Sequence, residues 1–85
     1  ARDANAKRKL SFNEKHALET LPIRIDALQK DAALLKATLA DTNLYSRNPA
    51  LFTKASEALA KAETDLAKAE EDWLALEILR EEIEG

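Results

Sequence analysis

The sequence predicts an all-α fold, with a short N-terminal helix followed by a two-helix antiparallel coiled-coil hairpin. Its 85 residues include 17 Ala and 14 Leu, which are strong helix formers. One Gly, two Pro and no Val leave few residues for tight hairpin turns and β-branched strands. Two long stretches also repeat apolar residues at alternating spacings of three and four, the pattern of helices that pack along one seam.

The N-terminal segment is predicted to be a basic linker over residues 1–10, which ends in Lys7, Arg8, Lys9 and Leu10. Ser11 and Glu14 then form a capping box, in which each side chain accepts a backbone N–H of the first helical turn. This predicts a coiled-coil domain over residues 11–85 that begins with a short helix at about 12–20.

Pro22 is predicted to separate this short helix from the first long one. Proline has no N–H to donate and disfavours helical geometry in the residue before it, so a break is expected near Leu21 and a new helix over about 22–40. Its apolar seam consists of Leu21, Ile25, Leu28, Ala32, Leu35 and Leu39.

The segment at 41–48 is rich in turn-forming Asp, Asn, Ser and Pro residues and is predicted to be a loop. Asn48 as N-cap with Pro49 in the first helical position then starts a helix over about 49–83. Its seam is Phe52, Ala55, Leu59, Ala62, Leu66, Ala69, Trp73, Leu76, Arg80 and Ile83. A connection this short makes the two long helices antiparallel, and large residues then face small ones, with Trp73 as a core anchor beside Leu18 and Phe12.

Size and composition argue against catalysis by this chain alone. A chain of 85 residues is too small to enclose a deep cofactor cavity. His16, the single His, has no second His or Cys to share a metal, and we interpret it as a helix-surface residue. The acidic residues after position 69 lack the oxygen-rich loop that calcium needs, so they are expected to form a solvated face. No metal, cofactor or catalytic residue is assigned.

Two features suit contact with nucleic acid. Lys54, Lys61 and Lys68 recur every seven residues and are expected to form one stripe, here called the lysine stripe, with Glu57, Glu63, Asp65, Glu70 and Asp72 toward the other side. Ordinary charge decoration is the alternative, since Asp26 and Lys30, and Glu57 and Lys61, are pairs four residues apart. In the loop, Tyr45 is suited to stacking on a nucleotide base and Arg47 to contact with a phosphate. Alternatively, Leu44 and Tyr45 fold back to close the hairpin end.

The net charge of −3 argues against broad non-specific binding, so a nucleic-acid contact has to be local. The candidate contacts are Lys7, Arg8, Lys9, Tyr45, Arg47, Lys54, Lys61 and Lys68. Two alternatives remain open: a structural hairpin that packs on protein, and a self-associating coiled coil. A closed hairpin with both seams covered is expected to be monomeric. No apolar run reaches the length of a membrane span, and the Ala at position 1 is consistent with a domain of a longer protein.

Three segments resemble one known family. Residues 9–15 (KLSFNEK) and 18–22 (LETLP) resemble the "KLSYKEQ…LE.LP" opening of the C-terminal domain of ABC-F ATPases, particularly the Uup type. Residues 39–45 (LADTNLY), 47–49 (RNP) and Phe52 resemble its "LAD…LY.RDP..F" loop, and residues 73–77 (WLALE) its closing "W..LE" segment. The resemblance extends from Lys9 to about Glu82.

The resemblance implies a coiled-coil hairpin associated with nucleic-acid binding, with DNA or ribosomal RNA as partner. It also implies a cytoplasmic parent protein whose two tandem cassettes, upstream in the same chain, bind ATP and magnesium and act in translation. Within that parent the present chain is a non-enzymatic C-terminal appendage. Its alternative role is to position or regulate the cassettes without binding nucleic acid.

Overall fold

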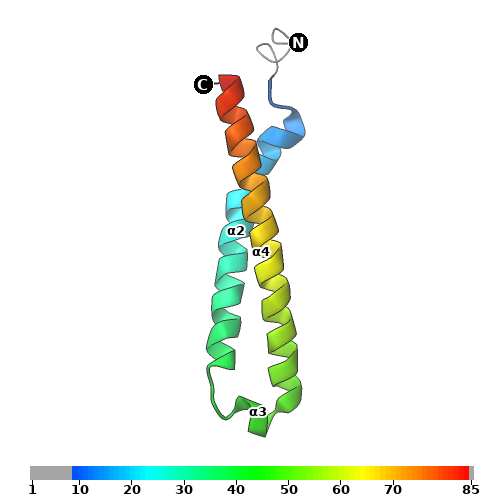
Figure 1. Ribbon diagram of the computed structural model, residues 1–85, viewed down its shortest axis with the longest axis vertical. Coiled ribbons are helices and arrows are strands. Elements are labelled where there is room, and N and C mark those ends of the chain that lie inside the picture. Colours follow the sequence, from blue (N-terminus) through cyan, green and yellow to red (C-terminus); the bar gives the residue numbers. More distant parts are fainter. Residues whose placement is uncertain (1–8, 85) are drawn as a thin grey trace.

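The computed structural model describes residues 9–84, which form an elongated hairpin of helices. Its overall dimensions are 64 × 19 × 18 Å. Two long helices, α2 (Phe12–Leu39) and α4 (Pro49–Glu84), run antiparallel, and the one-turn helix α3 (Leu44–Arg47) lies between them at the end of the rod (Figure 1). We call this end, residues 41–48, the tip, and the opposite end the base. The predicted all-α antiparallel hairpin is therefore confirmed.

Local sequence signals start both long helices. The Ser11 hydroxyl accepts the Glu14 N–H at 3.1 Å, and the Glu14 carboxylate accepts the Ser11 N–H at 2.8 Å, so the capping box is confirmed. The Asn48 side chain accepts the Leu51 N–H at 3.1 Å, and Pro49 is the first residue of α4. Each cap satisfies backbone donors that have no partner inside the helix.

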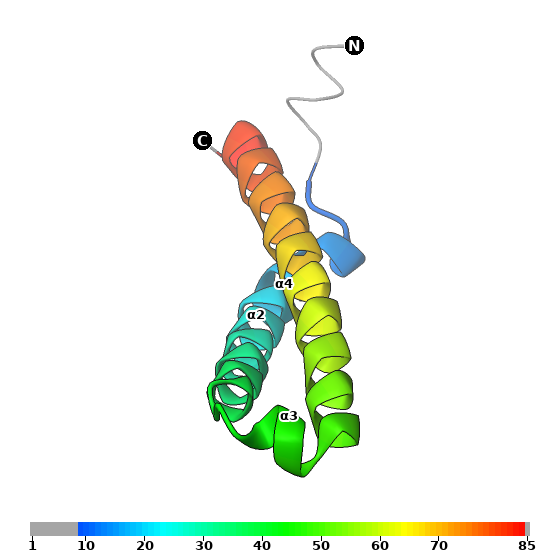
Figure 2. The ribbon, with the colours of Figure 1, turned by 60° about the horizontal axis from the view of Figure 1, so that its bottom comes forward.

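The predicted break between a helix at 12–20 and another at 22–40 is wrong. α2 is continuous from Phe12 to Leu39 and contains Pro22. Proline removes one helical hydrogen bond, which bends a helix without necessarily ending it. Leu18 and Leu21 before the ring, and Ile25 after it, are all partly buried, so packing against α4 holds both halves helical. The first turns of α2 lie at an angle to the rest (Figures 1 and 2).

The predicted loop at 41–48 contains the helical turn α3. Backbone hydrogen bonds from Arg47 N–H to the Asn43 carbonyl at 3.0 Å, and from Asn48 N–H to the Leu44 carbonyl at 2.8 Å, close this turn. Leu44 is only 3% exposed, so the turn covers the end of the apolar seam. Burial of this one leucine offsets the weak helix propensity of the surrounding turn-forming residues.

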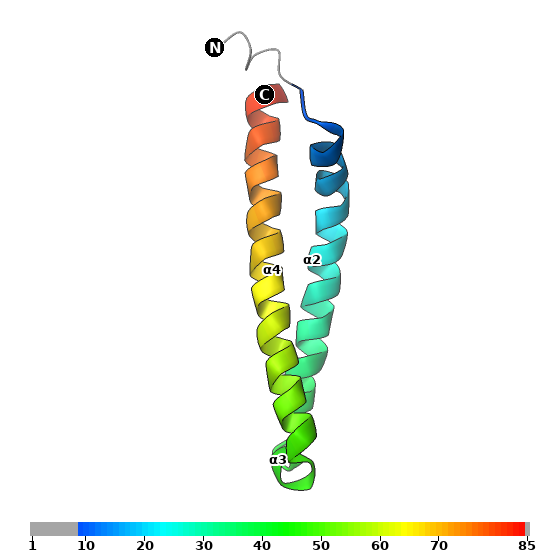
Figure 3. The ribbon, with the colours of Figure 1, turned by 90° about the vertical axis from the view of Figure 1, so that its right-hand side faces the viewer.

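The seam between α2 and α4 follows the predicted spacing. Each predicted seam position except Arg80 is buried or partly buried. The most buried positions are alanines: Ala32 of α2 and Ala55, Ala62 and Ala69 of α4, each at 8% exposure or less. Small residues at every seventh position of α4 let the two backbones approach, and the two ribbons remain neighbours in two perpendicular views (Figures 1 and 3).

The base is packed differently from the expectation. Leu10, just before α2, is buried at 8% exposure, whereas Phe12 is 81% exposed and stacks on the His16 ring with centroids 6.2 Å apart. Phe12 therefore does not pack beside Trp73. Leu18 is partly buried as expected. Within residues 9–84, no helix combines the length and apolar character that crossing a membrane requires.

Candidate nucleic-acid interface

The tip presents an aromatic ring because its neighbour is buried. Leu44 points into the end of the seam at 3% exposure, and the next residue of α3, Tyr45, is 64% exposed. The Tyr45 ring meets the Phe52 ring of α4 edge to face, with centroids 5.3 Å apart and planes at 88°. Such a contact holds one side of the ring and leaves most of its surface open. Leu44 therefore folds back to close the hairpin, as one alternative expected, whereas Tyr45 stays largely exposed.

Asp41 organises the tip. Its Oδ1 accepts the Asn43 N–H at 3.0 Å, and its backbone carbonyl accepts the Leu44 N–H at 3.1 Å. Its Oδ2 accepts a hydrogen bond from Arg47 Nη2 at 2.6 Å. One carboxylate thus links the end of α2 to both ends of α3. The Arg47 side chain remains 64% exposed and the Asp41 side chain 40% exposed.

Tyr45 and Arg47 do not converge on one spot. They are two residues apart on α3, and residues at that spacing lie on opposite sides of a helical turn. Tyr45 contacts Phe52 of α4, whereas Arg47 contacts Asp41 just after α2. The tip therefore offers an aromatic contact on one side and a cationic contact on the other, so a single nucleotide meets one of them and an extended strand can meet both.

Charge is distributed unevenly along the rod. Within residues 36–54, Lys36, Arg47 and Lys54 outnumber Asp41, but Lys36 Nζ lies 3.6 Å from Glu63 Oε2, and residues 41–48 of the tip have no net charge. Residues 70–84 contain seven acidic residues and one basic residue, Arg80, which gives this segment a formal charge of −6. The tip and the C-terminal end of α4 lie at opposite ends of the molecule (Figure 1). An anionic partner is consequently repelled by the end of α4, and the tip is the more favourable end for it.

The lysine stripe is interleaved with carboxylates. Lys61 Nζ lies 3.1 Å from Asp65 Oδ2, and Lys68 Nζ lies 2.8 Å from Asp72 Oδ1. The hydrogen bond that the Lys68 ammonium donates to Asp72 raises the pKa of Lys68 above its ordinary value. The expectation that these aspartates lie away from the lysines is wrong, because residues four apart share one side of a helix.

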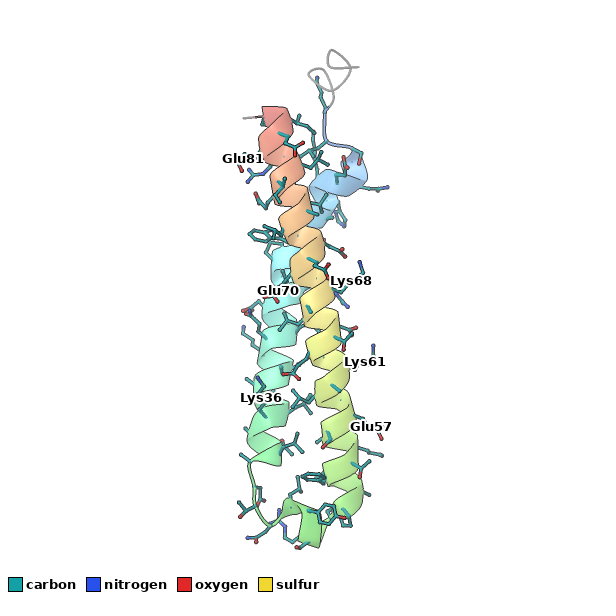
Figure 4. The ribbon with its side chains drawn as sticks, viewed as in Figure 1. Lys36, Glu57, Lys61, Lys68, Glu70 and Glu81 are labelled. Atoms are coloured by element: carbon teal, nitrogen blue, oxygen red, sulfur yellow. The ribbon has the colours of Figure 1, made fainter. Side chains whose placement is uncertain are left out.

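Figure 4 shows Lys61 and Lys68 on the same side of α4 as Glu57. The expected pair of Glu57 with Lys61 is not formed within residues 9–84, whereas Asp26 and Lys30 do pair, at 2.9 Å. Lys54, nearest the tip, makes no ion pair with any residue in the described part of the chain. It is therefore the member of the stripe whose charge is least offset.

One of the remaining candidate contacts lies at the base. Lys9 is exposed just before Leu10, at the opposite end of the rod from the tip, and Lys7 and Arg8 lie outside the described residues. The structure thus divides the predicted contacts into three places: the tip with Tyr45 and Arg47, the length of α4, and the base. Sequence reasoning missed Asp41, although an Asp two residues before an Asn in a turn is a common side-chain cap of the backbone.

The base also carries an apolar groove beside Trp73. Pro22 and Ile25 of α2 line it together with Trp73, Leu74 and Glu70 of α4, around a volume of about 400 Å³. Trp73 is partly buried, as expected of a core anchor, and Leu74 is 54% exposed. His16 is exposed on the surface of α2, and no cluster of three or more His, Asp or Glu residues suited to a metal occurs among residues 9–84.

Comparison with protein families matches residues 9–78 to the ABC transporter C-terminal domain. The chain belongs to this family. ABC transporter C-terminal domains of this kind are found in ABC-F proteins like Uup, so the resemblance seen in the sequence is confirmed. The matched range contains the capping box, the tip and most of α4, and the domain is a non-catalytic appendage. Neither a search of curated proteins nor a search of solved structures gives a significant match.

Proposed function

We propose that this ABC transporter C-terminal domain is a nucleic-acid-contacting appendage of a cytoplasmic ABC-F ATPase, and that its tip makes the contact. In this proposal the cassettes of the parent chain bind ATP and magnesium, and the hairpin extends away from them as a rigid arm. The partner is DNA or ribosomal RNA with unpaired bases. The isolated hairpin acts as a monomer.

The observation that carries the proposal is the exposed Tyr45 at the tip of the rod, the end away from the acidic residues of α4. A ring that is 64% exposed offers a face on which a base can stack, and only an unpaired base has a free face to offer. Arg47, also exposed, and Lys54, which makes no ion pair within residues 9–84, supply cations for the flanking phosphates. Lys61 and Lys68 contribute less, because Asp65 and Asp72 offset their charges.

Fluorescence anisotropy of labelled oligonucleotides tests this proposal. Single-stranded DNA and RNA of about 12 nucleotides are within the span of known single-strand sites, and duplexes of the same sequence serve for comparison. We expect single strands to bind better than duplexes. Base stacking on an aromatic residue contributes about 1–3 kcal/mol, so Tyr45→Ala is expected to weaken binding at least fivefold.

A matched control for Tyr45 exists at the base. Phe12 is 81% exposed, so Phe12→Ala removes a comparable aromatic surface from the other end of the rod and is expected to leave binding unchanged. Equal losses in both variants would indicate a contact that is not centred on the tip. No binding of any oligonucleotide at low salt would remove the proposal.

A second candidate function is supported by the groove at the base. The hairpin would position the cassettes of the parent protein through a protein contact at Trp73 and Leu74, without nucleic acid. Leu74 and Ile78 lie one turn apart on α4 and are each at least 50% exposed. In the full-length parent, Leu74→Glu would then change ATP turnover in the absence of nucleic acid, whereas Tyr45→Ala would not. The opposite outcome favours the tip.

A further inference from the structure

We propose that Asp41 is an internal competitor for the phosphate-binding cation Arg47, so that it sets the affinity of the tip for nucleic acid. This inference rests on the proposed function. It concerns the one cation of the tip that is already held by a carboxylate, and it assigns a role to a residue that is not itself a contact for an anionic partner.

The geometry places Arg47 in a phosphate-like contact before any partner arrives. Its Nη2 donates to Asp41 Oδ2 at 2.6 Å, at the short end for a charge-assisted hydrogen bond between a guanidinium and a carboxylate. A phosphate oxygen that binds the same nitrogen has to replace this carboxylate oxygen. Both groups are substantially exposed, at 64% for Arg47 and 40% for Asp41, so the exchange requires no opening of the core.

The other bonds of Asp41 keep the carboxylate in place as the guanidinium comes and goes. Oδ1 accepts the Asn43 N–H at 3.0 Å, so the orientation of the carboxyl group does not depend on Arg47. The Leu44 N–H bonds to the Asp41 backbone carbonyl, and Leu44 is fixed by burial. The competitor is therefore held by further bonds of the tip, whereas Asp41 is the one side-chain partner that the Arg47 guanidinium has within residues 9–84.

Position 41 differs in this respect from the other paired aspartates. Asp65 and Asp72 neutralise lysines through contacts four residues apart within α4, an arrangement common on any exposed helix. The Asp41 pair instead spans the connection between two helices, and its Arg47 belongs to the same helical turn as the exposed Tyr45. A change of charge at position 41 thus acts directly where the partner is expected.

Asp41→Asn tests the inference with little change in shape. Asn keeps an Oδ1 that can accept the Asn43 N–H, but it removes the negative charge that holds Arg47. Exposed ion pairs shift equilibria by a factor of up to about five, so we expect single-stranded oligonucleotides to bind about two- to fivefold more tightly. Anisotropy titrations of the 85-residue chain at low salt measure this change.

Two controls separate competition for Arg47 from a general effect of charge. Asp26→Asn makes the same charge change at an ion pair on the length of α2, 2.9 Å from Lys30, and is expected to leave affinity almost unchanged. In an Arg47→Gln background, Asp41→Asn is expected to give no gain, because the cation that it releases is missing. The double-mutant cycle therefore isolates the coupling between the two residues.

The outcomes distinguish the inference from the function on which it rests. Wild-type binding with a gain for Asp41→Asn that disappears in Arg47→Gln supports both. Wild-type binding with no gain, or with a gain that persists in Arg47→Gln, overturns the inference and leaves the proposed function standing. No binding by the wild-type chain or any variant overturns both.

Discussion

Substitution of Ala69 by Leu tests the close approach of the two long helices. Ala69 is 3% exposed, at one of three alanines spaced by seven along α4 that meet α2. The larger side chain adds three carbon atoms where almost no surface is open. Such overpacking typically costs about 1–3 kcal/mol, because the helices have to separate or side chains have to leave their preferred rotamers.

Thermal unfolding followed by far-UV circular dichroism measures this cost. For a domain of 60–100 residues, each kcal/mol lowers the melting temperature by about 4–8 °C, so Ala69→Leu is expected to unfold at least about 4 °C below wild type. Ala67→Leu is the matched control, since Ala67 is exposed on the same helix and the exchange is nearly neutral in helix propensity. A melting temperature for Ala69→Leu equal to or above those of wild type and Ala67→Leu would refute the alanine packing.

Three further predictions concern the N-cap of α2, the buried leucine of the tip and one ion pair of α4. Ser11→Ala removes the hydroxyl that accepts the Glu14 N–H and is expected to cost about 1 kcal/mol in urea unfolding; an unchanged midpoint would count against the cap. Leu44→Ala opens the end of the seam and is expected to cost about 2 kcal/mol or more and to weaken oligonucleotide binding, whereas stability equal to wild type would contradict its anchoring role. The hydrogen bond that Lys68 donates to Asp72 raises the pKa of Lys68 above 10.5, so the stabilisation that this pair contributes is present below pH 10.5 and is lost as the pH rises through the raised pKa. NMR titration should show the Lys68 pKa falling toward 10.5 in Asp72→Asn, and an unchanged value would exclude the pair.

Features that depend on neighbouring residues could be predicted from the sequence. The capping box of Ser11 and Glu14 and the start of α4 at Asn48 and Pro49 need only a few adjacent residues, and both occur as expected. The seam positions follow from helix periodicity, which packing enforces along the whole length of both helices. The family resemblance likewise depends on short runs of residues in order.

Features that depend on tertiary packing could not be predicted in the same way. Pro22 signals a helix end by itself, but partly buried residues on both sides of it keep α2 continuous. The pair of Asp41 and Arg47 joins residues six apart across a turn, and no periodic pattern places them together. The pairing of Lys61 with Asp65 and of Lys68 with Asp72 could have been predicted from the sequence. A lysine four residues before an aspartate on a helix forms an ion pair, although a less favourable one than in the reverse order.

These differences change the functional interpretation of the charges. From the sequence, the three lysines of the stripe are candidates for nucleic-acid contact together with Tyr45 and Arg47 of the tip and the basic residues 7–9. In the structure, Lys61 and Lys68 are paired with Asp65 and Asp72, so Lys54, nearest the tip, is the lysine of the stripe that no ion pair within residues 9–84 offsets. The overall charge of −3 is then compatible with a local contact, because seven of the 16 acidic residues lie within residues 70–84 at the far end of α4.

Backbone NMR of the labelled chain during titration with a single-stranded oligonucleotide tests the proposed function most directly. The proposal predicts that the largest shifts fall within residues 41–54 and that the acidic end of α4, residues 76–84, stays unperturbed. Addition of salt should reverse the shifts, because phosphate contacts release counterions. Shifts centred on the base or on Lys61 and Lys68, or no shifts at low salt, would contradict a nucleic-acid contact at the tip.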